Sequence, residues 1–151
     1  MIDIGFYQLA QRRVEAVLPP LVTRALSAGH RVLIRSSDAA VLTTIDAALW
    51  SHAPDGFIPH GIDLAIGPER AASQPVLLTR DAPITTNAAD CLAQVGDDLP
   101  DDLTGLTRLF FLFDADNLEI ARARWRVLNN AAGVRPVYWR ESDAGRFEKA
   151  G

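Results

Sequence analysis

Short apolar runs that suit β-strands alternate with segments of helical periodicity in the first third of the chain. Residues 1–7 are β-branched and aromatic, and residues 31–35 form an apolar run bounded by arginines. Each run precedes a segment with apolar residues at helical spacing, about residues 20–27 and residues 36–50. Strands joined through helices pair in parallel by right-handed crossovers. The alternation predicts an α/β fold, a single three-layer domain with a central, largely parallel sheet flanked by helices.

Capping residues and breakers predict where these two helices begin and end. Pro19 and Pro20 should interrupt or kink any helix that begins upstream, because proline lacks the amide donor. Gly29 is a typical residue at the end of a helix. The run Ser-Ser-Asp at residues 36–38 supplies side-chain oxygens that cap the start of the second helix, which ends near Trp50.

The rest of the chain supplies further strands and one clear helix. We expect strands at residues 76–79, 109–113 and 134–139, the start of another at 84–86, and a loop over 51–72 with an extended piece at 64–66. Asp114 caps the clearest helix, over residues 114–132, and Gly133 ends it. The predicted domain covers residues 1–140, and residues 141–151 form a polar tail that frays.

Composition narrows the range of functions. The chain has 151 residues, 48% of them hydrophobic, which suits one domain with a substantial core. Its net charge of -4 disfavours a broad nucleic-acid surface, so we expect only indirect contact with DNA. Cys91 is the only cysteine, which is typical of the reducing cytosol. Because the sequence also lacks a signal peptide and an apolar run of about 20 residues, we expect a cytoplasmic protein without membrane contact.

Motifs for nucleotide binding and catalysis are missing from the sequence. There is no G-x-x-x-x-G-K-[ST] and no G-x-G-x-x-G, so the expected fold is Rossmann-like without a nucleotide site. The three histidines lack metal-ligand spacing, and Asp114, which with Asp116 could hold magnesium, is explained by capping. The acidic run at residues 97–102 is interpreted as a solvated turn. We expect no catalytic residue, no metal and no cofactor, with a nucleotide-binding enzyme as the alternative.

Two aromatic patches have features that a core does not require. The first contains Trp50 at a helix end and Phe57 in a proline-bounded loop. Both residues suit a satellite core, and both equally suit aromatic anchors for a protein partner. The sequence leaves these two interpretations open.

The second patch is the run Ala-Arg-Ala-Arg-Trp-Arg at residues 121–126. Arg122 and Arg126 are four residues apart and share a helix face, with Trp125 beside them. One interpretation is a solvated helix whose arginines pair with Asp116 or Glu119. The other is a socket for an acidic peptide with an apolar end, because arginine pairs with carboxylates while the tryptophan packs against an apolar side chain.

Several segments along almost the whole chain resemble one known family. They are Phe6-Tyr7, AGHRVLI at residues 28–34, IDAALW at 45–50, FIPH at 57–60 with Gly67, Pro75-Val76, ARARWR at 121–126, Gly133 and Trp139. Together and in this order, they resemble the chi subunit of bacterial DNA polymerase III, an accessory subunit of the clamp loader.

The resemblance implies a non-catalytic protein that links other proteins during replication. Members bind the C-terminal tail of single-stranded DNA-binding protein on one surface and the psi subunit, or an accessory helicase, on another. The implied tail site consists of Arg122, Trp125 and Arg126, with Gly133 permitting close approach and Phe111 lining the apolar floor. The implied surface for the psi subunit or helicase uses Trp50 and Phe57. The protein is then a monomer within a hetero-complex.

One segment departs from the family pattern. After Trp125 and Arg126, the usual aromatic and basic residues are replaced by Val-Leu-Asn-Asn at 127–130, and the spacing to Gly133 is one residue longer. This replacement predicts a weaker basic rim around the implied tail site.

Overall fold

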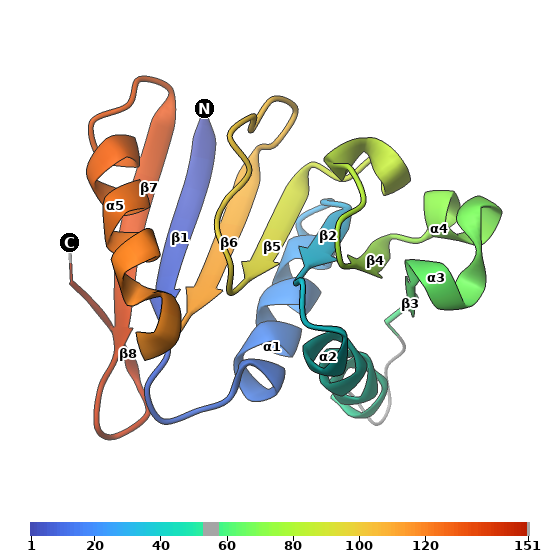
Figure 1. Cartoon of the computed structure of the whole chain (residues 1–151), viewed down its shortest axis with the longest axis horizontal. Helices are drawn as coiled ribbons and strands as arrows, with labels where there is room; N and C mark the ends of the chain where they lie inside the picture. The colour runs from blue at the N-terminus through green and yellow to red at the C-terminus, as the bar shows by residue number, and fades with distance from the viewer. Residues whose placement is uncertain (53–57, 151) are drawn as a thin grey trace.

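One mixed sheet forms the centre of the computed structural model, which describes residues 1–52 and 58–150. Its strands are β1 (Ile2–Gln8), β2 (Val32–Arg35), β3 (His60–Ile62), β4 (Val76–Thr79), β5 (Cys91–Val95), β6 (Arg108–Phe113), β7 (Val134–Glu141) and β8 (Phe147–Lys149). Their order across the sheet is β3-β4-β2-β5-β6-β1-β7-β8 (Figure 1). Neighbouring strands are parallel except β7 and β8, which are antiparallel.

Helices cover both faces of this sheet. They are α1 (Val14–Ser27), α2 (Ala39–Ser51), α3 (Asp63–Ile66), α4 (Pro68–Ser73) and α5 (Leu118–Leu128), with 3-10 turns η1 (Ile84–Asn87) and η2 (Ala115–Asn117). Side chains of a strand alternate between the faces, so Val32 and Ile34 pack in the cluster with α1 and α2, whereas Leu33 packs in the cluster with α4 and α5. The predicted three-layer α/β fold is confirmed. No helix within the described ranges is long and apolar enough to span a membrane.

Helix α1 begins at Val14, well before the predicted start near residue 20, and it contains Pro19 and Pro20. A proline inside a helix costs about 3 kcal/mol or more, because it removes an amide donor and crowds the preceding turn. The apolar face of α1 compensates for this cost, since Val17, Leu18 and Leu21 are buried against the sheet. The predicted helix start near residue 20 was therefore wrong, and the prolines do not interrupt the helix that begins upstream.

The middle of the chain differs most from the sequence-based expectation. Residues 64–66 are helical, as part of α3, and the extended piece is β3, which begins four residues earlier. Asp63 is the first residue of α3, and its side chain accepts hydrogen bonds from the Leu64 amide at 2.8 Å and the Thr79 hydroxyl at 2.6 Å. The predicted strand start at 84–86 is the 3-10 turn η1, fixed by the buried Asn87 amide, which donates to the Val32 carbonyl at 3.0 Å.

The last third of the chain follows the prediction with shifted ends. Asp114 caps η2 rather than α5 itself, since its side chain accepts the Asp116 amide at 2.9 Å, and α5 ends at Leu128. The tail expected to fray from residue 141 is instead part of the sheet. Strand β7 continues to Glu141, and β8 pairs with it from Phe147 to Lys149.

The carboxylate of Glu141 joins the end of β7 to the loop after β1. Its side chain is fully buried and accepts the backbone amides of Ala10, Gln11 and Arg12 at 2.7–3.1 Å, and the Arg12 Nε at 3.0 Å. Burial opposes ionisation, but these donors outweigh it and lower the pKa of Glu141 to about 2. Because the folded-state pKa lies below the ordinary value of 4.5, the charged form stabilises the fold.

Glu141→Gln should lower the free energy of unfolding at pH 7 by roughly 3–4 kcal/mol, since the pKa falls from 4.5 to about 2 and each pKa unit corresponds to about 1.4 kcal/mol. The contribution is complete above the ordinary pKa of 4.5 and disappears as the pH falls toward 2. Urea unfolding at pH 7, 4 and 2.5 measures the effect, and the difference between wild type and variant should shrink with falling pH. Glu148→Gln, on the exposed face of β8, is the matched control and should change little. A difference that does not depend on pH would contradict this role for Glu141.

Candidate functional site

Helix α5 packs on β1 and β7 (Figure 1). An aromatic cluster centred on Phe6 forms this contact. The Trp125 ring meets Phe6 edge-on, with centroids 5.3 Å apart, and meets Tyr138 edge-on at 5.4 Å. Phe6 and Tyr138 themselves lie nearly parallel, because these residues are register partners on adjacent strands. Trp125 is only half-buried, so part of its indole faces solvent. The cluster fixes an aromatic floor at the surface of α5.

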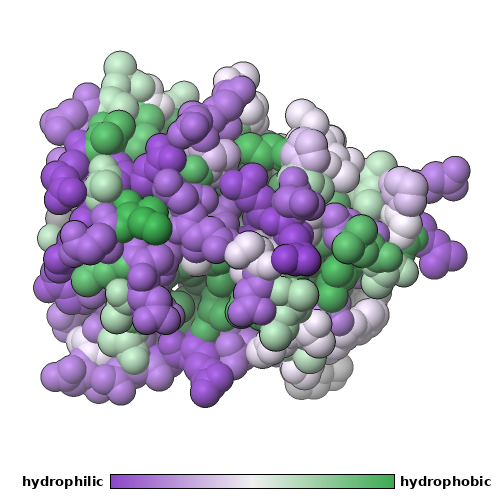
Figure 2. Space-filling view, viewed as in Figure 1, coloured by the Kyte–Doolittle hydropathy of each residue, from purple (hydrophilic) through white to green (hydrophobic). Residues whose placement is uncertain are grey.

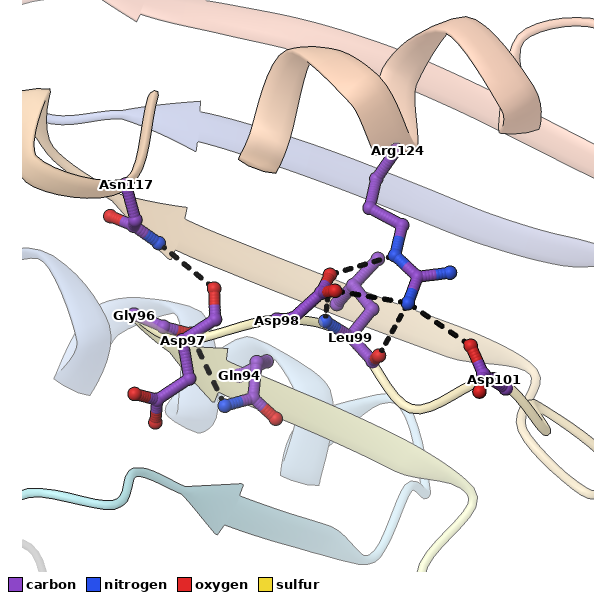
Figure 3. A network of polar contacts seen from close by, with 8 residues as sticks. All are labelled: Gln94, Gly96, Asp97, Asp98, Leu99, Asp101, Asn117 and Arg124. Carbon is purple, nitrogen blue, oxygen red and sulfur yellow. Dashed lines mark hydrogen bonds and ion pairs between the residues drawn. The ribbon is translucent and has the colours of Figure 1, made fainter. Parts of the chain in front are cut away.

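The three arginines of α5 have different environments, and Arg124 faces the acidic loop after β5. Its guanidinium donates to both carboxylate oxygens of Asp98 at 2.7 and 3.1 Å, and to the Leu99 carbonyl and Asp101, both at 3.1 Å (Figure 3). The hydrogen bond from Arg124 is the main cause that lowers the pKa of Asp98. The loop is therefore tied to α5, whereas the sequence predicted only a solvated turn. Arg124 has a structural role here.

Arg122 and Arg126 remain available on the outer surface of α5. Arg122 makes a single ion pair with Glu119 at 3.5 Å, and both side chains are at least half-exposed. Exposed pairs of this kind contribute only about 0–1 kcal/mol. The exposed Arg126 guanidinium has no ion-pair partner within the described ranges. One interpretation of the sequence is that these arginines simply pair with Asp116 or Glu119 on a solvated helix. The pair with Glu119 is present but weak, and no arginine of α5 pairs with Asp116 in the part of the chain described.

Two further residues join this surface from β7. Tyr138 and Arg140 are two positions apart on one strand, so their side chains share the face that α5 covers. Burial raises the pKa of Tyr138, and the positive charges of Arg122 and Arg140 oppose this rise. The sequence reasoning missed both residues. The period of two in the last strand was the signal that could have revealed them.

We call Arg122, Trp125, Arg126, Tyr138 and Arg140 the α5 surface. Viewed from the side of Figure 1, the molecule is mostly hydrophilic with small apolar patches (Figure 2). The exposed apolar residues on α5 are Ile120 and Val127. A half-buried aromatic floor with cations around it suits an extended acidic ligand with an apolar group.

Gly133, directly before β7, and Phe111, on β6, have different settings. Gly133 is exposed with φ at 76°, and a Cβ added there would meet nothing within 4 Å. The backbone conformation rather than a close neighbour therefore favours glycine at this position. Phe111 is 0% exposed and packs 5.8 Å from Phe6, centroid to centroid. It supports the aromatic floor from beneath, with no surface left for a ligand to contact.

Trp50 lies on a separate surface, at the C-terminal end of α2, with 58% of the residue exposed. Its ring packs 4.8 Å from the buried His60 ring. His60 is held on both sides, since Nδ1 lies 2.6 Å from the Ile58 carbonyl oxygen and Nε2 lies 3.1 Å from Asp46 Oδ1. Phe57, which the sequence pairs with Trp50, lies outside the described residues. Helices α2 and α5 lie far apart in Figure 1.

A cleft of about 830 Å³ opens at the carboxyl ends of the central strands, where nucleotides bind in related folds. Its lining includes Asp38, Asp97, Asp114 and Asp116. Asp38 and Asp114 cap helical turns, and Asp97 accepts the Ser37 amide and hydroxyl. With Glu15, these carboxylates outnumber the two arginines of the lining, Arg12 and Arg13, so the cleft is net negative and gives no support to the alternative of a nucleotide-binding enzyme. Residues 1–52 and 58–150 contain no group of three or more metal-ligating side chains placed to hold an ion.

Arg124→Ala should lower the free energy of unfolding by roughly 1–2 kcal/mol, because it removes a two-pronged, partly buried ion pair. Arg122→Ala is the matched control on the same helix, and its weak pair predicts a loss below about 0.5 kcal/mol. A double-mutant cycle with Asp98→Ala, followed by urea unfolding, measures the coupling directly. Equal losses for the two arginines would contradict the structural role of Arg124.

Comparison with known proteins gives one match that covers most of the chain. The family model described as DNA polymerase III chi subunit, HolC, matches residues 1–135. The match runs from β1 through α5 to the first residues of β7. No curated protein matches the sequence.

Proposed function

This chain belongs to the DNA polymerase III chi subunit family, and we propose that it links the clamp loader, or an accessory helicase, to the C-terminal tail of single-stranded DNA-binding protein. The family makes the chain an accessory subunit of the polymerase complex and points to a role without chemistry of its own. The link to the tail and the identity of the second partner are the parts of the role that we propose.

The observation that carries the proposal is the α5 surface, where Arg122 and Arg126 remain available on either side of Trp125. An acidic tail with an apolar end complements this surface, which offers positive charge and an aromatic ring. Its carboxylates pair with the guanidinium groups, and its apolar side chain packs against the exposed part of the indole. Hydrogen bonds to charged groups contribute about 1.5–3 kcal/mol each, so two or three of them support a micromolar dissociation constant.

The composition of the rim differs from the family pattern in this chain. Val127 is 65% exposed, and Asn129 and Asn130 carry no charge, so the C-terminal end of α5 contributes only Arg126 as a cation. Arg140 adds a positive charge from β7, next to Tyr138. We infer that the tail lies between α5 and β7 rather than along the end of the helix.

The second partner is proposed to bind through Trp50. An exposed tryptophan held in place by a buried neighbour is typical of an interface anchor, because it buries a large area with little loss of conformational entropy. The psi subunit or an accessory helicase occupies this surface in our proposal. Since α2 and α5 lie on different faces of the sheet, one molecule can hold both partners at once.

Tethering is the proposed mechanism. A polymerase assembly bound through Trp50 is held near single-stranded DNA that is coated with the tail-bearing protein, and its local concentration rises accordingly. The step needs no bond to be made or broken. The positions of its two contacts on separate surfaces are sufficient.

Arg122→Ala and Arg126→Ala should each weaken binding of a fluorescent peptide, made from the last ten residues of the organism's single-stranded DNA-binding protein, by at least tenfold. Binding should also weaken as salt rises, because the contacts at the rim are electrostatic. Fluorescence anisotropy measures the affinity. Arg135→Ala is the matched control, since Arg135 pairs with Asp3 at 2.7 Å on the opposite face of β7. Unchanged affinity in both α5 variants would remove the site.

Trp50→Ala should abolish capture of the psi subunit or helicase in a pull-down, while the tail peptide binds as before. Because Trp50 is exposed, Trp50→Ala should lower the free energy of unfolding by only about 1 kcal/mol. A loss of capture would therefore not be explained by unfolding of the variant. Val127→Ala, which truncates another exposed apolar side chain, controls for general effects on solubility. Capture that survives the Trp50 substitution would refute this assignment.

A further inference from the structure

A groove runs along α1 on the face of the sheet opposite α5. It consists of two adjoining cavities of about 220 and 270 Å³, which share Tyr7, Leu21 and Arg24. The remaining lining residues are Arg12, Val17, Pro20, Trp139 and Phe147 in the first cavity and Ala25, Ala28, His30, Arg108 and Phe110 in the second. We call this the α1 groove. It is separate from the α5 surface and from the Trp50 surface.

Glycine in β1 makes the groove possible. A Cβ added to Gly5 would lie 2.6 Å from Cε2 of Tyr7, so only glycine leaves room for the Tyr7 ring to lie back along the strand. The ring is then fixed by Phe147, edge-on at 5.3 Å, and by Phe110 at 6.0 Å. Tyr7 thus forms a rigid division between the two cavities.

The charge of the groove is opposite to that of the chain as a whole. Three arginines line it and no carboxylate does, in a protein whose net charge is -4. Arg12 is neutralised by the buried Glu141, but Arg24 is exposed and its guanidinium has no hydrogen-bond or ion-pair partner within the described residues. Arg108 lies over the Phe110 ring at 5.2 Å. Tyr7, Arg24 and Arg108 line the same cavity. Burial raises the pKa of Tyr7, and the charges of Arg108 and Arg24 oppose that rise.

Neighbouring carboxylates do not cancel this charge. Asp90 lies near the second cavity, but it is hydrogen-bonded to His30 at 2.9 Å and to the Arg31 amide. Asp3 feels the charge of Arg108, but it pairs with Arg135. An anionic ligand therefore finds Arg24 and Arg108 ready to bind it.

The apolar walls of the first cavity come from α1 and from the C-terminal hairpin. Trp139 and Phe147 are half-buried, and with Val17, Pro20 and Leu21 they form the walls of the first cavity. Both aromatic residues lie beyond residue 135, where the family match ends. The groove therefore depends on a segment that the match does not include.

The exposure of the rings identifies the kind of ligand. Single-stranded nucleic acid is typically held by aromatic faces on which bases stack. Tyr7 and Phe110 are only 9% and 3% exposed, so neither offers an open face for a base, and Trp139 and Phe147 are themselves half-buried. A small apolar cavity next to two available arginines suits a peptide side chain with carboxylates on either side.

We propose that the α1 groove binds an acidic peptide segment of a partner protein. A large apolar side chain of the segment enters the cavity between α1 and the β7–β8 hairpin, and its carboxylates pair with Arg24 and Arg108. This site is additional to the α5 surface, and because the sheet separates the two, each binds without the other.

Nuclear magnetic resonance of the full chain tests the proposal with the blocked hexapeptide Asp-Asp-Leu-Phe-Asp-Asp as probe. The protein carries Arg122→Glu and Arg126→Glu, so that the α5 surface does not take up the peptide. The Arg24 Nε–H and Trp139 indole N–H signals should shift with added peptide. A further Arg24→Glu substitution should weaken binding at least tenfold, and Arg24→Gln should weaken it less, because only the charge is removed.

Two control ligands make the outcome decisive. The peptide with asparagine in place of aspartate should bind at least tenfold more weakly, and a ten-nucleotide oligothymidylate should not shift the Trp139 signal. The proposal is overturned if the Arg24 and Trp139 signals do not move, if both peptides bind equally, or if the oligonucleotide binds better. Failure of the tail peptide at the α5 surface would leave these signals unaffected, so the two proposals fail separately.

Discussion

The packing of other aromatic rings around the buried Phe6 holds β6, α5 and β7 together. This one ring, with no exposed surface, touches rings from three other elements: Phe111 and Phe113 of β6, Trp125 of α5, and Tyr138 of β7. Aromatic pairs in such geometries contribute about 0.5–1.5 kcal/mol each beyond their buried area. The position of α5, and so of its arginines, follows from packing around a residue in the first strand.

Much of the fold is predictable from the sequence where packing and local preference agree. The apolar runs of β2, β4 and β6 and the cap at Asp38 are of this kind, and all are confirmed. Strand β5 could not be recognised, because Cys-Leu-Ala-Gln-Val has little β-branched character and includes a polar residue. Gln94 is accommodated only because its amide bonds to the Arg35 and Gly96 carbonyls. The Arg35 partner lies 59 residues away in the sequence, and the side chains that bury α1 around Pro19 are also remote from it, so local pattern cannot reveal either.

The candidate site was predictable as a set of residues on α5 but not as a surface. Helical spacing placed Arg122, Trp125 and Arg126 together, and it could not show that Arg124, one residue from Trp125, is directed to the loop of Asp98. The contribution of Arg140 depends on parallel pairing of β7 with β1, which joins residues more than a hundred positions apart. Local pattern indicates which side chains share a helix face. Only the sheet register shows what lies opposite them.

The same register has a consequence for the order in which the protein folds during synthesis. Strand β1 pairs with β6 on one side and β7 on the other, so its first partner begins at Arg108. At about 5–20 residues per second, the ribosome needs roughly 5–20 s to make the intervening chain. Meanwhile Phe6 has no ring to pack against, and β1 has two open edges, which makes the nascent chain vulnerable to association. The N-terminal strand is thus translated first but enters the sheet late.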